Sequence, residues 1–365
     1  MSDSSVGLVH DYLLVMRGAE RTFATIADCF PDAPIYTLLY DPGGTSGAFD
    51  GREVRTSYLQ RLGANQRSFR RLLPLLPRAA ERLPVQEHDL VISSSGAFAH
   101  AVRPRLGAIH ICYCHSPFRY AWFERERAEQ ELPRPLRPLL RVALDRVRKA
   151  DLAASRRVSH YIANSEATRR RIERFWGRKA TVIHPPVDVH RFTLGKPEDY
   201  LLVVTELVAH KQVDLALEAA SRARRRLKVV GTGPELERLR ARHGDHAEFL
   251  GRVGDHQLAQ LYSHALALVV ANVEEFGIAA VEAQAAGRPV VAPAAGGTLE
   301  TVVPGKTGVL VPPGDPDALA DALRATDFRR FSPEAIREHA QRFSREAFQG
   351  RFRAEVERLT ALQVA

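Results

Sequence analysis

The amino-acid sequence predicts an α/β protein of two domains, each built on a parallel β-sheet. Three observations support this fold class. The 365 residues exceed the size at which a single hydrophobic core usually stops growing. Short apolar runs alternate with segments of helical periodicity in both halves of the chain, which is typical of parallel sheets with crossover helices. A proline-rich stretch from Pro185 to Pro197 separates the halves and marks the predicted domain boundary.

Composition and charge limit the possible partners. Hydrophobic residues make up 45% and charged residues 26% of the chain, as in ordinary globular proteins. The net charge of +9 favours acidic partners such as nucleotide phosphates, anionic lipid headgroups or polyanionic sugars. No nucleic-acid reader motif is present, so we expect no nucleic-acid partner.

The same numbers bear on location. Three cysteines do not make a disulfide framework and fit a reducing compartment. The first residues lack the pattern of a signal peptide, and no apolar run approaches about 18 residues. We therefore expect a cytoplasmic protein that touches the inner face of the plasma membrane at most from its surface.

The first half opens with a strand, a turn and a helix. Apolar residues at 6–9 predict the strand, and the helical pattern covers 21–29. Gly18 and Ala19 lie in the turn between them. A glycine turn before a helix brings backbone N–H groups close to a phosphate, although such a loop can equally be a purely structural turn.

A later strand of the first half, predicted at 108–114, leads directly into His115. A histidine at the carboxyl end of a parallel strand is well placed to line a ligand cleft, and its alternative role is capping or packing. His110, Cys112 and Cys114 lie close to it in sequence. These residues lack the paired C-x-x-C spacing of zinc sites, so we predict no metal site here.

A basic segment, residues 61–82, holds six arginines and one glutamate among leucines and a phenylalanine. This composition predicts an amphipathic surface for an anionic membrane or a lipid-linked acceptor, and the equally open alternative is a solvated helix face. Residues 134–157, with eight basic and two acidic residues, can extend the same surface. The six arginines are Arg61, Arg67, Arg70, Arg71, Arg78 and Arg82.

The second half is organised around residues 272–305. A strand is predicted at 265–271, a helix of small residues at 277–286 and a further strand at 289–292. Glu274 lies in the loop before the helix and Glu282 in its middle, so both carboxylates can reach one crevice at the carboxyl end of the sheet. No Lys or Arg lies between Asn272 and Ala286, which makes ligand hydroxyls natural partners for these acids. The alternative is a solvated loop acid and a helix acid paired to an arginine elsewhere.

Two helix starts carry polar residues that can act as N-caps. Ser165 precedes a basic helix predicted at 166–176. Asp255 opens a helix predicted at 256–262, and we interpret it as the N-cap in preference to a base-reading residue.

These motifs resemble those of a known family. One stretch contains Glu274 and Glu282 with Phe276-Gly277 between them, followed by Ala-Gly-Arg-Pro-Val-Val and Gly-Gly-Thr-x-Glu. This stretch resembles the donor site of the retaining glycosyltransferases of family 4, which have the GT-B fold. The resemblance extends over essentially the whole chain. It implies two Rossmann-like domains facing each other across a cleft, with residues 1–190 binding the acceptor and residues 191–345 the nucleotide-sugar donor. It also implies a C-terminal helix, residues 346–365, that packs back onto the first domain.

The resemblance implies roles for individual residues. Catalytic roles fall to His115 near the transferred sugar, to Lys211 on the donor diphosphate and to Glu274 on the hydroxyls of the hexose. Glu282 faces the ribose, and the residue at 253 meets the nucleobase. The remaining donor contacts implied by the family pattern are Gly18, Ala19, Val253, Phe276, Gly277 and Ile278. A glycine turn before a helix adds Gly231 as a donor-binding candidate, although no third glycine follows with dinucleotide-binding spacing.

Within this family, the chain is most similar to bacterial mannosyltransferases of O-antigen or exopolysaccharide synthesis. The similarity lies in the motifs Val-His-Asp-Tyr, Met-Arg-Gly, Cys-His-Ser-Pro-Phe-Arg-Tyr-Ala-Trp and Ile-Ala-Asn-Ser. The resemblance implies transfer of a hexose, with mannose from GDP-mannose as the expected donor, to a glycan or glycolipid hydroxyl without a metal or cofactor. Two departures from the pattern keep alternatives open: Glu206 stands where the family often has arginine, and Ala19 where a second glycine is frequent. The alternatives are a UDP-sugar donor and a non-catalytic protein that binds nucleotide sugars.

Overall fold

The computed structural model describes residues 5–63, 68–130 and 132–362. The chain divides into two compact units. Unit 1 comprises Met1–His184 and Gln349–Ala365, and unit 2 comprises Pro185–Phe348. The first division falls at the start of the proline-rich stretch, a few residues before the boundary predicted after residue 190.

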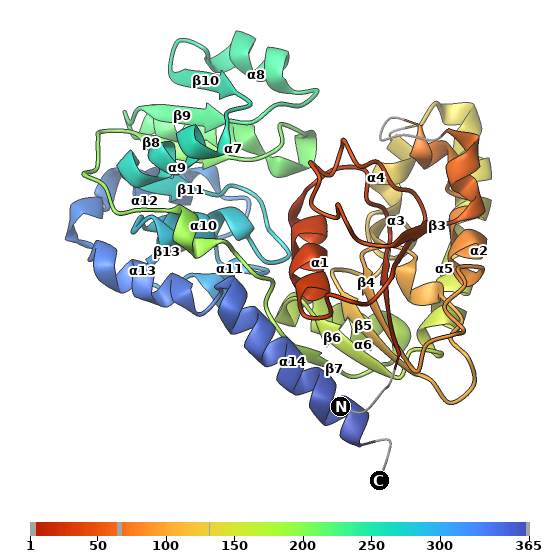
Figure 1. Cartoon of the computed structure of the whole chain (residues 1–365). Helices are drawn as coiled ribbons and strands as arrows, with labels where there is room; N and C mark the ends of the chain where they lie inside the picture. Colours follow the sequence, from red (N-terminus) through yellow and green to blue (C-terminus); the bar gives the residue numbers. More distant parts are fainter. Residues whose placement is uncertain (1–4, 64–67, 131, 363–365) are drawn as a thin grey trace. The chain divides into compact units, whose positions relative to one another are not determined.

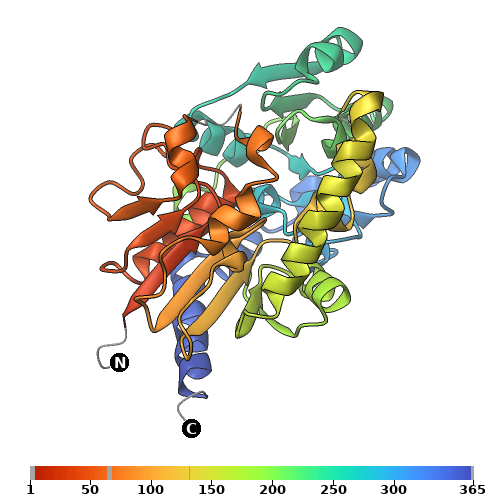
Figure 2. The same cartoon turned by 90° about the vertical axis from the view of Figure 1, so that its right-hand side faces the viewer.

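Unit 1 is built on a parallel sheet of seven strands with the order β3-β2-β1-β4-β5-β6-β7. Figure 2 shows the red and orange strands of this sheet side by side. The order reverses between β1 and β4, which is the place where open parallel sheets bind ligands. The strands are β1 (Val6–His10), β2 (Ile35–Thr37), β3 (Val54–Thr56), β4 (Leu90–Ser95), β5 (Ile109–Cys114), β6 (His160–Ala163) and β7 (Ala180–Val182).

The helices of unit 1 cross between these parallel strands. They are α1 (Gly18–Asp28), α2 (Leu76–Glu81), α3 (Arg119–Trp122), α4 (Arg125–Gln130), α5 (Arg137–Ser155) and α6 (Glu166–Trp176). The last helix, α14 (Arg345–Ala361), is blue in Figure 1; it begins in unit 2, and its residues from Gln349 onwards belong to unit 1. There the ring of Phe352 lies 6.2 Å from that of Tyr113 in β5, and Glu355 accepts a 2.8 Å hydrogen bond from Thr181.

Unit 2 is built on a parallel sheet of six strands with the order β10-β9-β8-β11-β12-β13, which reverses between β8 and β11 (Figure 1). Alternate strand residues enter two separate cores, because a parallel sheet is covered on both faces. Leu202 and Leu268 join the core that contains α9 and α10, whereas Val203 and Val269 join the core of α7 and α12. The strands are β8 (Leu201–Val204), β9 (Leu227–Val230), β10 (Ala247–Gly251), β11 (Ala267–Val269), β12 (Val290–Pro293) and β13 (Gly308–Val311).

Seven helices of unit 2 connect these strands or follow them. They are α7 (Val213–Arg222), α8 (Leu236–His243), α9 (Asp255–His264), α10 (Ile278–Ala285), α11 (Thr298–Thr301), α12 (Pro316–Ala325) and α13 (Pro333–Gln341). The Ser165 cap of α6 in unit 1 is confirmed, since its hydroxyl accepts a hydrogen bond from the Thr168 N–H at 3.2 Å. The Asp255 cap is wrong. The N-cap of α9 is Gly254, and the Asp255 carboxylate lies 3.3 Å from the Arg191 guanidinium instead.

The described residues of the basic segment 61–82 do not form one helix. The segment contains the end of a 3-10 turn (Tyr58–Leu62), a second 3-10 turn (Phe69–Leu72) and the short helix α2, with Pro74 and Pro77 interrupting any longer helix. Arg61, Arg78 and Arg82 are exposed. Arg67 lies outside the described residues, and the side chains of Arg70 and Arg71 are likewise not described. Among the helices that the structure describes, none is long and apolar enough to cross a membrane.

Candidate functional site

Lys211 and Glu274 meet at the point where the strand order of unit 2 reverses. Lys211 follows β8 and Glu274 follows β11, and these strands are neighbours in the sheet. The Lys211 ammonium lies 2.7 Å from Oε1 of Glu274, and the Asn272 amide donates to the same oxygen at 3.1 Å. Both charged side chains keep about a fifth to a quarter of their surface exposed, at 20% and 24%. The ion pair is therefore held in place and still open to a ligand.

The loop that carries Lys211 is tightly constrained. Lys211 ends a 3-10 turn, and the next residue, Gln212, has a left-handed backbone with φ of +50°, which is uncommon for a residue with a side chain. Gly231 follows the neighbouring strand β9 with φ of +140°, and a Cβ there would lie 1.8 Å from the Thr205 carbonyl oxygen. Only glycine allows this approach of the two loops. The predicted donor residue Gly231 thus shapes the loop that leads from β8 to Lys211.

A second pair of loops fixes Glu274. The backbone N–H of Gly297 donates to the Glu274 carbonyl at 2.8 Å. A Cβ on Gly296 would lie 2.3 Å from that carbonyl oxygen, and a Cβ on Gly297 would lie 2.2 Å from Cα of Phe276. The Gly-Gly-Thr motif therefore packs backbone against backbone on the segment 274–276, and it orients the carboxylate without touching it.

Glu282, from the middle of α10, lies in a polar cluster of its own. Its Oε2 accepts a 3.0 Å hydrogen bond from the Tyr262 hydroxyl of α9, and its Oε1 lies 3.7 Å from the Arg191 guanidinium. Burial raises the pKa of Tyr262, and the neighbouring Glu282 carboxylate adds to this rise, so the hydroxyl stays protonated and donates. Both acids therefore have partners within the protein, and the pairing of Glu282 with a distant arginine agrees with the alternative left open by the sequence.

The start of α10 presents backbone rather than side chains. Gly277 is the N-cap with φ of +91°, and Ile278 begins the helix, whose first turn has N–H groups without intrahelical acceptors. The Phe276 side chain is buried and its ring lies 5.5 Å from that of Phe343, so Phe276 contributes only its backbone. Val253, in the loop after β10, is half-buried and packs against the core that contains α10.

His115 belongs to a hydrogen-bonded chain at the carboxyl edge of the unit 1 sheet, where the strands end. Its Nε2 lies 2.8 Å from the Ser94 hydroxyl, which in turn lies 3.1 Å from Nδ1 of His10. These residues stand at the ends of β5, β4 and β1, so the chain runs across the reversal in strand order. The hydroxyl has a single proton and can donate to only one of the two imidazoles, so at least one ring must donate to Ser94, and the tautomers of the two rings are coupled.

Burial keeps both imidazoles of this chain neutral. It lowers the pKa of His115 to about 4 and that of His10 to about 3, and the neighbouring His115 lowers the pKa of His10 further. Near pH 7, His115 can thus exchange hydrogen bonds with a ligand but carries no charge. His10 also stacks on Phe23 of α1, with the ring centroids 4.7 Å apart.

Asp11, immediately after β1, holds the neighbouring loop. Its two carboxylate oxygens accept four backbone N–H bonds of 2.6–2.9 Å from residues 96–99, the loop that follows β4. Burial raises the pKa of this carboxyl, whereas the four N–H donors act in the opposite direction. Asp11 is thus a structural clamp beside the His115 chain, and its oxygens are already occupied.

Gly18 and Ala19 are the first two residues of α1. The helix starts three residues before the predicted position because the Arg17 N–H donates to the Glu20 carboxylate at 3.1 Å, which closes the first turn. Burial raises the pKa of Glu20 to about 7. An alanine in the first turn of a helix needs no special backbone, so Ala19 is compatible with its position.

The structure brings the predicted site residues together in two groups, one in each unit. The carboxyl edge of the unit 2 sheet carries Lys211, Glu274, Gly231 and the start of α10. His115 lies at the carboxyl edge of the other sheet, the one in unit 1. Sequence reasoning missed the residues that hold these groups in place, which are His10, Asp11, Ser94, Arg191, Tyr262 and Asn272. For His10, Asp11 and Ser94 a signal existed, since each stands at or just after the end of an apolar strand. Within the described residues, no three His, Cys, Asp or Glu side chains are arranged to hold a metal ion.

Several characterised proteins are similar to this chain in sequence. It is 39% identical over 219 residues to D-inositol 3-phosphate glycosyltransferase of Geodermatophilus obscurus, which covers 50% of this chain and 49% of that protein. It is 33% identical over 223 residues to the GDP-mannose-dependent alpha-(1-6)-phosphatidylinositol monomannoside mannosyltransferase of Mycolicibacterium smegmatis, covering 51% and 56%. The chain thus spans about half the length of the curated relatives it matches.

Solved structures share the fold over the whole chain. Sucrose-phosphate synthase from Thermosynechococcus elongatus aligns with a TM-score of 0.72 at 20% identity, over 98% of this chain and all of that one. Anabaena HepE in complex with UDP aligns with a TM-score of 0.71, also at 20% identity, over 97% and 99%.

Two family models match the chain, one over most of each unit. The model of Glycosyltransferase Family 4 matches residues 16–191, and the model of Glycosyl transferases group 1 matches residues 188–343. Together the matches run without a gap from residue 16 to residue 343. The chain therefore belongs to the family 4 glycosyltransferases and has their GT-B fold of two Rossmann-like parallel-sheet domains.

Proposed function

We propose that this protein transfers a hexose from a nucleotide sugar to a hydroxyl of a glycan or glycolipid acceptor, with retention of configuration at the anomeric carbon. The observation that carries the proposal is the Lys211–Glu274 pair at the reversal in strand order of unit 2. A cation and a carboxylate side by side suit the two halves of a sugar diphosphate. The ammonium favours the phosphates, and the carboxylate accepts hydrogen bonds from the sugar hydroxyls.

In the proposed reaction, the acceptor hydroxyl attacks the anomeric carbon on the face that the diphosphate is leaving. The bond from that carbon to the phosphate oxygen breaks, the bond to the acceptor oxygen forms, and the departing phosphate takes the hydroxyl proton. The protein contributes position and charge and needs no nucleophile. Lys211 has three N–H donors, and only one is directed at Glu274, so others are available for phosphate oxygens.

The neutral state of His115 fits a positioning role toward the sugar. Because burial lowers its pKa to about 4, the imidazole adds no charge to the site at neutral pH and can bind a hydroxyl or a phosphate oxygen through one N–H. Glu282 is proposed to bind the ribose, with Arg191 and Tyr262 holding its carboxylate in place.

For the donor we propose GDP-mannose. The Mycolicibacterium smegmatis relative is named as GDP-mannose-dependent, and this agrees with the motif similarity to bacterial mannosyltransferases. A UDP-sugar is the second candidate, because Anabaena HepE, of the same fold, holds UDP. Glu206, exposed in the loop between β8 and Lys211, stands where the family often has arginine, and its negative charge is expected to weaken diphosphate binding.

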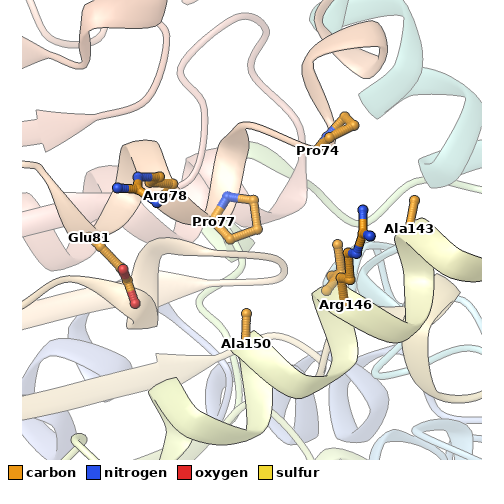
Figure 3. A pocket seen from close by; sticks show the side chains of 8 residues that line it. Pro74, Pro77, Arg78, Glu81, Ala143, Arg146 and Ala150 are labelled. Atoms are coloured by element: carbon orange, nitrogen blue, oxygen red, sulfur yellow. The ribbon is translucent and has the colours of Figure 1, made fainter.

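A lipid-linked acceptor and a peripheral position at the inner membrane surface are also proposals. They are supported by a groove of about 310 Å³ between α2 and α5, with apolar walls from Pro74, Pro77 and Val147 and with Arg78 and Arg146 at its sides (Figure 3). On α5, the helix that forms one side of the groove, Leu139 and Val142 are exposed at 71% and 48%. Cations together with exposed apolar side chains suit an anionic bilayer surface.

The donor proposal is tested by titrating GDP-mannose, GDP and several UDP-sugars while following thermal stability, and then by measuring transfer with the donor that binds. Lys211→Ala is expected to lower the transfer rate about 100-fold or more, because it removes a charge beside the leaving diphosphate. Lys228→Ala is the matched control: Lys228 is also 20% exposed and lies 3.9 Å from a glutamate in the same unit, but on β9. Tighter binding of a UDP-sugar would favour the second candidate, and full transfer by Lys211→Ala would refute the role of this residue.

A further inference from the structure

A small polar pocket opens at the amino edge of the unit 1 sheet, where the strands begin. It measures about 280 Å³ and is lined by three arginines, a histidine, a proline and an alanine. The pocket is formed by the loop that enters β5, by His110 near the start of β5 and by Arg157 after α5. His115 follows the other end of β5, so this pocket lies roughly 16 Å along the strand from the His115 chain. Its lining residues are Arg103, Pro104, Arg105, Ala108, His110 and Arg157.

Two nitrogen atoms of this lining are buried without a hydrogen-bond partner among the described residues. They are Nδ1 of His110 and Nε of Arg157. His110 is only 1% exposed, and its other ring nitrogen lies 2.8 Å from the Ser93 hydroxyl, which leaves Nδ1 as the free position. Buried polar atoms without partners are rare in folded proteins, and one cause is a bound group that satisfies them. Both atoms belong to residues that line the same pocket.

The charge of the pocket is positive. Arg103 and Arg157 share one carboxylate, Glu81, at 3.0 and 3.1 Å, and Arg105 is paired with Asp89. Three guanidinium groups therefore face two carboxylates, which leaves a surplus of one positive charge. Neither Glu81 nor Asp89 lines the pocket, whereas all three arginines do. Planar guanidinium groups bind phosphate oxygens through paired N–H bonds.

We propose that this pocket binds a phosphate group, with Arg103, Arg105 and Arg157 on its oxygens and the free ring nitrogen of His110 hydrogen-bonded to it. The group can come from a soluble phosphate compound or from a lipid headgroup. Leu106, in the same loop as Arg103 and Arg105, is fully exposed. If the phosphate belongs to a lipid headgroup, Leu106 would face the acyl region of the membrane. The proposal concerns the edge of the sheet opposite to His115 and does not depend on the proposed transfer reaction.

The test follows the ring nitrogens of His110 by nitrogen-15 NMR of histidine-labelled full-length protein during titration with inorganic phosphate. We expect a saturable shift of the His110 Nδ1 resonance with a dissociation constant in the millimolar range or below, and a loss of affinity of about tenfold or more in the double variant Arg103→Gln/Arg105→Gln. Both side chains of this pair are exposed, and tryptophan fluorescence verifies that the double variant is folded. Arg224→Gln/Arg329→Gln, two exposed arginines of unit 2, removes the same charge as a control.

Two further experiments distinguish the source of the phosphate group and define the results that would refute the site. If the phosphate is a lipid headgroup, phosphatidylglycerol vesicles shift the His110 resonance, phosphatidylcholine vesicles do not, and Leu106→Asp abolishes the vesicle effect without changing the phosphate titration. If it is a soluble compound, phosphate shifts the resonance and vesicles do not. An absent or non-saturating shift in all arms, or an equal response in the Arg103→Gln/Arg105→Gln and control variants, would overturn the site.

Discussion

At the scale of single residues, Ser94 links two neutral histidines and so decides how His115 is presented. Ser94→Ala removes the hydroxyl that lies 2.8 Å from His115 and 3.1 Å from His10. The loss of one neutral hydrogen bond on each side, about 1 kcal/mol, leaves the His115 ring and its tautomer poorly fixed. We expect kcat to fall about tenfold with little change in KM, measured by steady-state transfer assays.

Ser155→Ala serves as the control for this experiment. It removes an equally buried hydroxyl of unit 1 whose hydrogen bond goes to the Leu152 carbonyl. A comparable fall of kcat in both variants, or a rise of KM at constant kcat in Ser94→Ala, would show that Ser94 does not position His115.

In unit 2, Tyr262 positions Glu282 through a hydrogen bond, as Ser94 positions His115 in unit 1. Tyr262→Phe removes the 3.0 Å hydrogen bond to the carboxylate and leaves Arg191, at 3.7 Å, as its remaining named partner. We expect KM for the donor to rise severalfold, because the lost hydrogen bond, worth about 1 kcal/mol, no longer orients the carboxylate proposed to bind the ribose. Tyr200→Phe removes a 2.8 Å bond to the Leu261 carbonyl, and it should lower stability to a similar extent without changing KM. Equal KM values for the two variants would contradict a positioning role.

At the scale of elements, the Gly-Gly-Thr loop controls where Glu274 stands. Gly297 has an ordinary φ of −68°, so alanine is not strained there by its backbone, yet its Cβ would lie 2.2 Å from Cα of Phe276. Gly297→Ala must therefore move the loop or the segment that bears Glu274. We expect transfer activity to fall at least tenfold and the melting temperature to drop, measured by transfer assay and calorimetry.

Gly350→Ala provides the contrast to Gly297→Ala. Gly350 lies within α14, and nothing stands within 4 Å of a Cβ there. Alanine should stabilise the helix slightly and leave activity unchanged. If Gly297→Ala behaves in the same way, the packing of the Gly-Gly-Thr loop does not determine the position of Glu274.

The elements also show what a sequence reveals and what it conceals. The apolar runs of β4, β5 and β12 and the small-residue helix α10 were predictable, because buried parallel strands and helices leave continuous apolar segments. Glu274 and Glu282 were identified as candidates by their spacing within one loop and helix. Their pairing with Lys211 and Arg191 was not predicted, because these two residues are distant in sequence from the acids and no local pattern signals such a contact. The segment 61–82 was predicted as an amphipathic surface, and its division into short turns and α2 was not, although Pro74 and Pro77 signal such a division.

At the scale of the molecule, buried histidines and one buried glutamate give the stability of unit 1 a predictable dependence on pH. Burial lowers the pKa of His10 and His110 from 6.5 to about 3 and that of His115 to about 4. At pH 5 the unfolded chain therefore protonates all three histidines whereas the folded chain keeps them neutral, so stability is lost as the pH falls below 6.5. Each histidine costs about 2 kcal/mol at pH 5. Glu20 acts in the opposite direction: its pKa is raised from 4.5 to about 7, so it is protonated first in the folded state and contributes about 2 kcal/mol of stability between pH 7 and pH 5.

The two effects can be separated by denaturant unfolding followed by tryptophan fluorescence. Both tryptophans, Trp122 and Trp176, lie in unit 1, where each indole N–H donates to the buried Asp151 carboxylate, so the signal reports this unit. The unfolding free energy is expected to fall by about 4 kcal/mol from pH 7 to pH 5 in the natural sequence, and by about 6 kcal/mol in Glu20→Gln, which removes the opposing carboxyl. Replacing the exposed His246 by glutamine should change neither value. A fall of the same size with and without Glu20 would show that this carboxyl titrates normally, and no fall in Glu20→Gln would show that the three histidines are not held neutral by the fold.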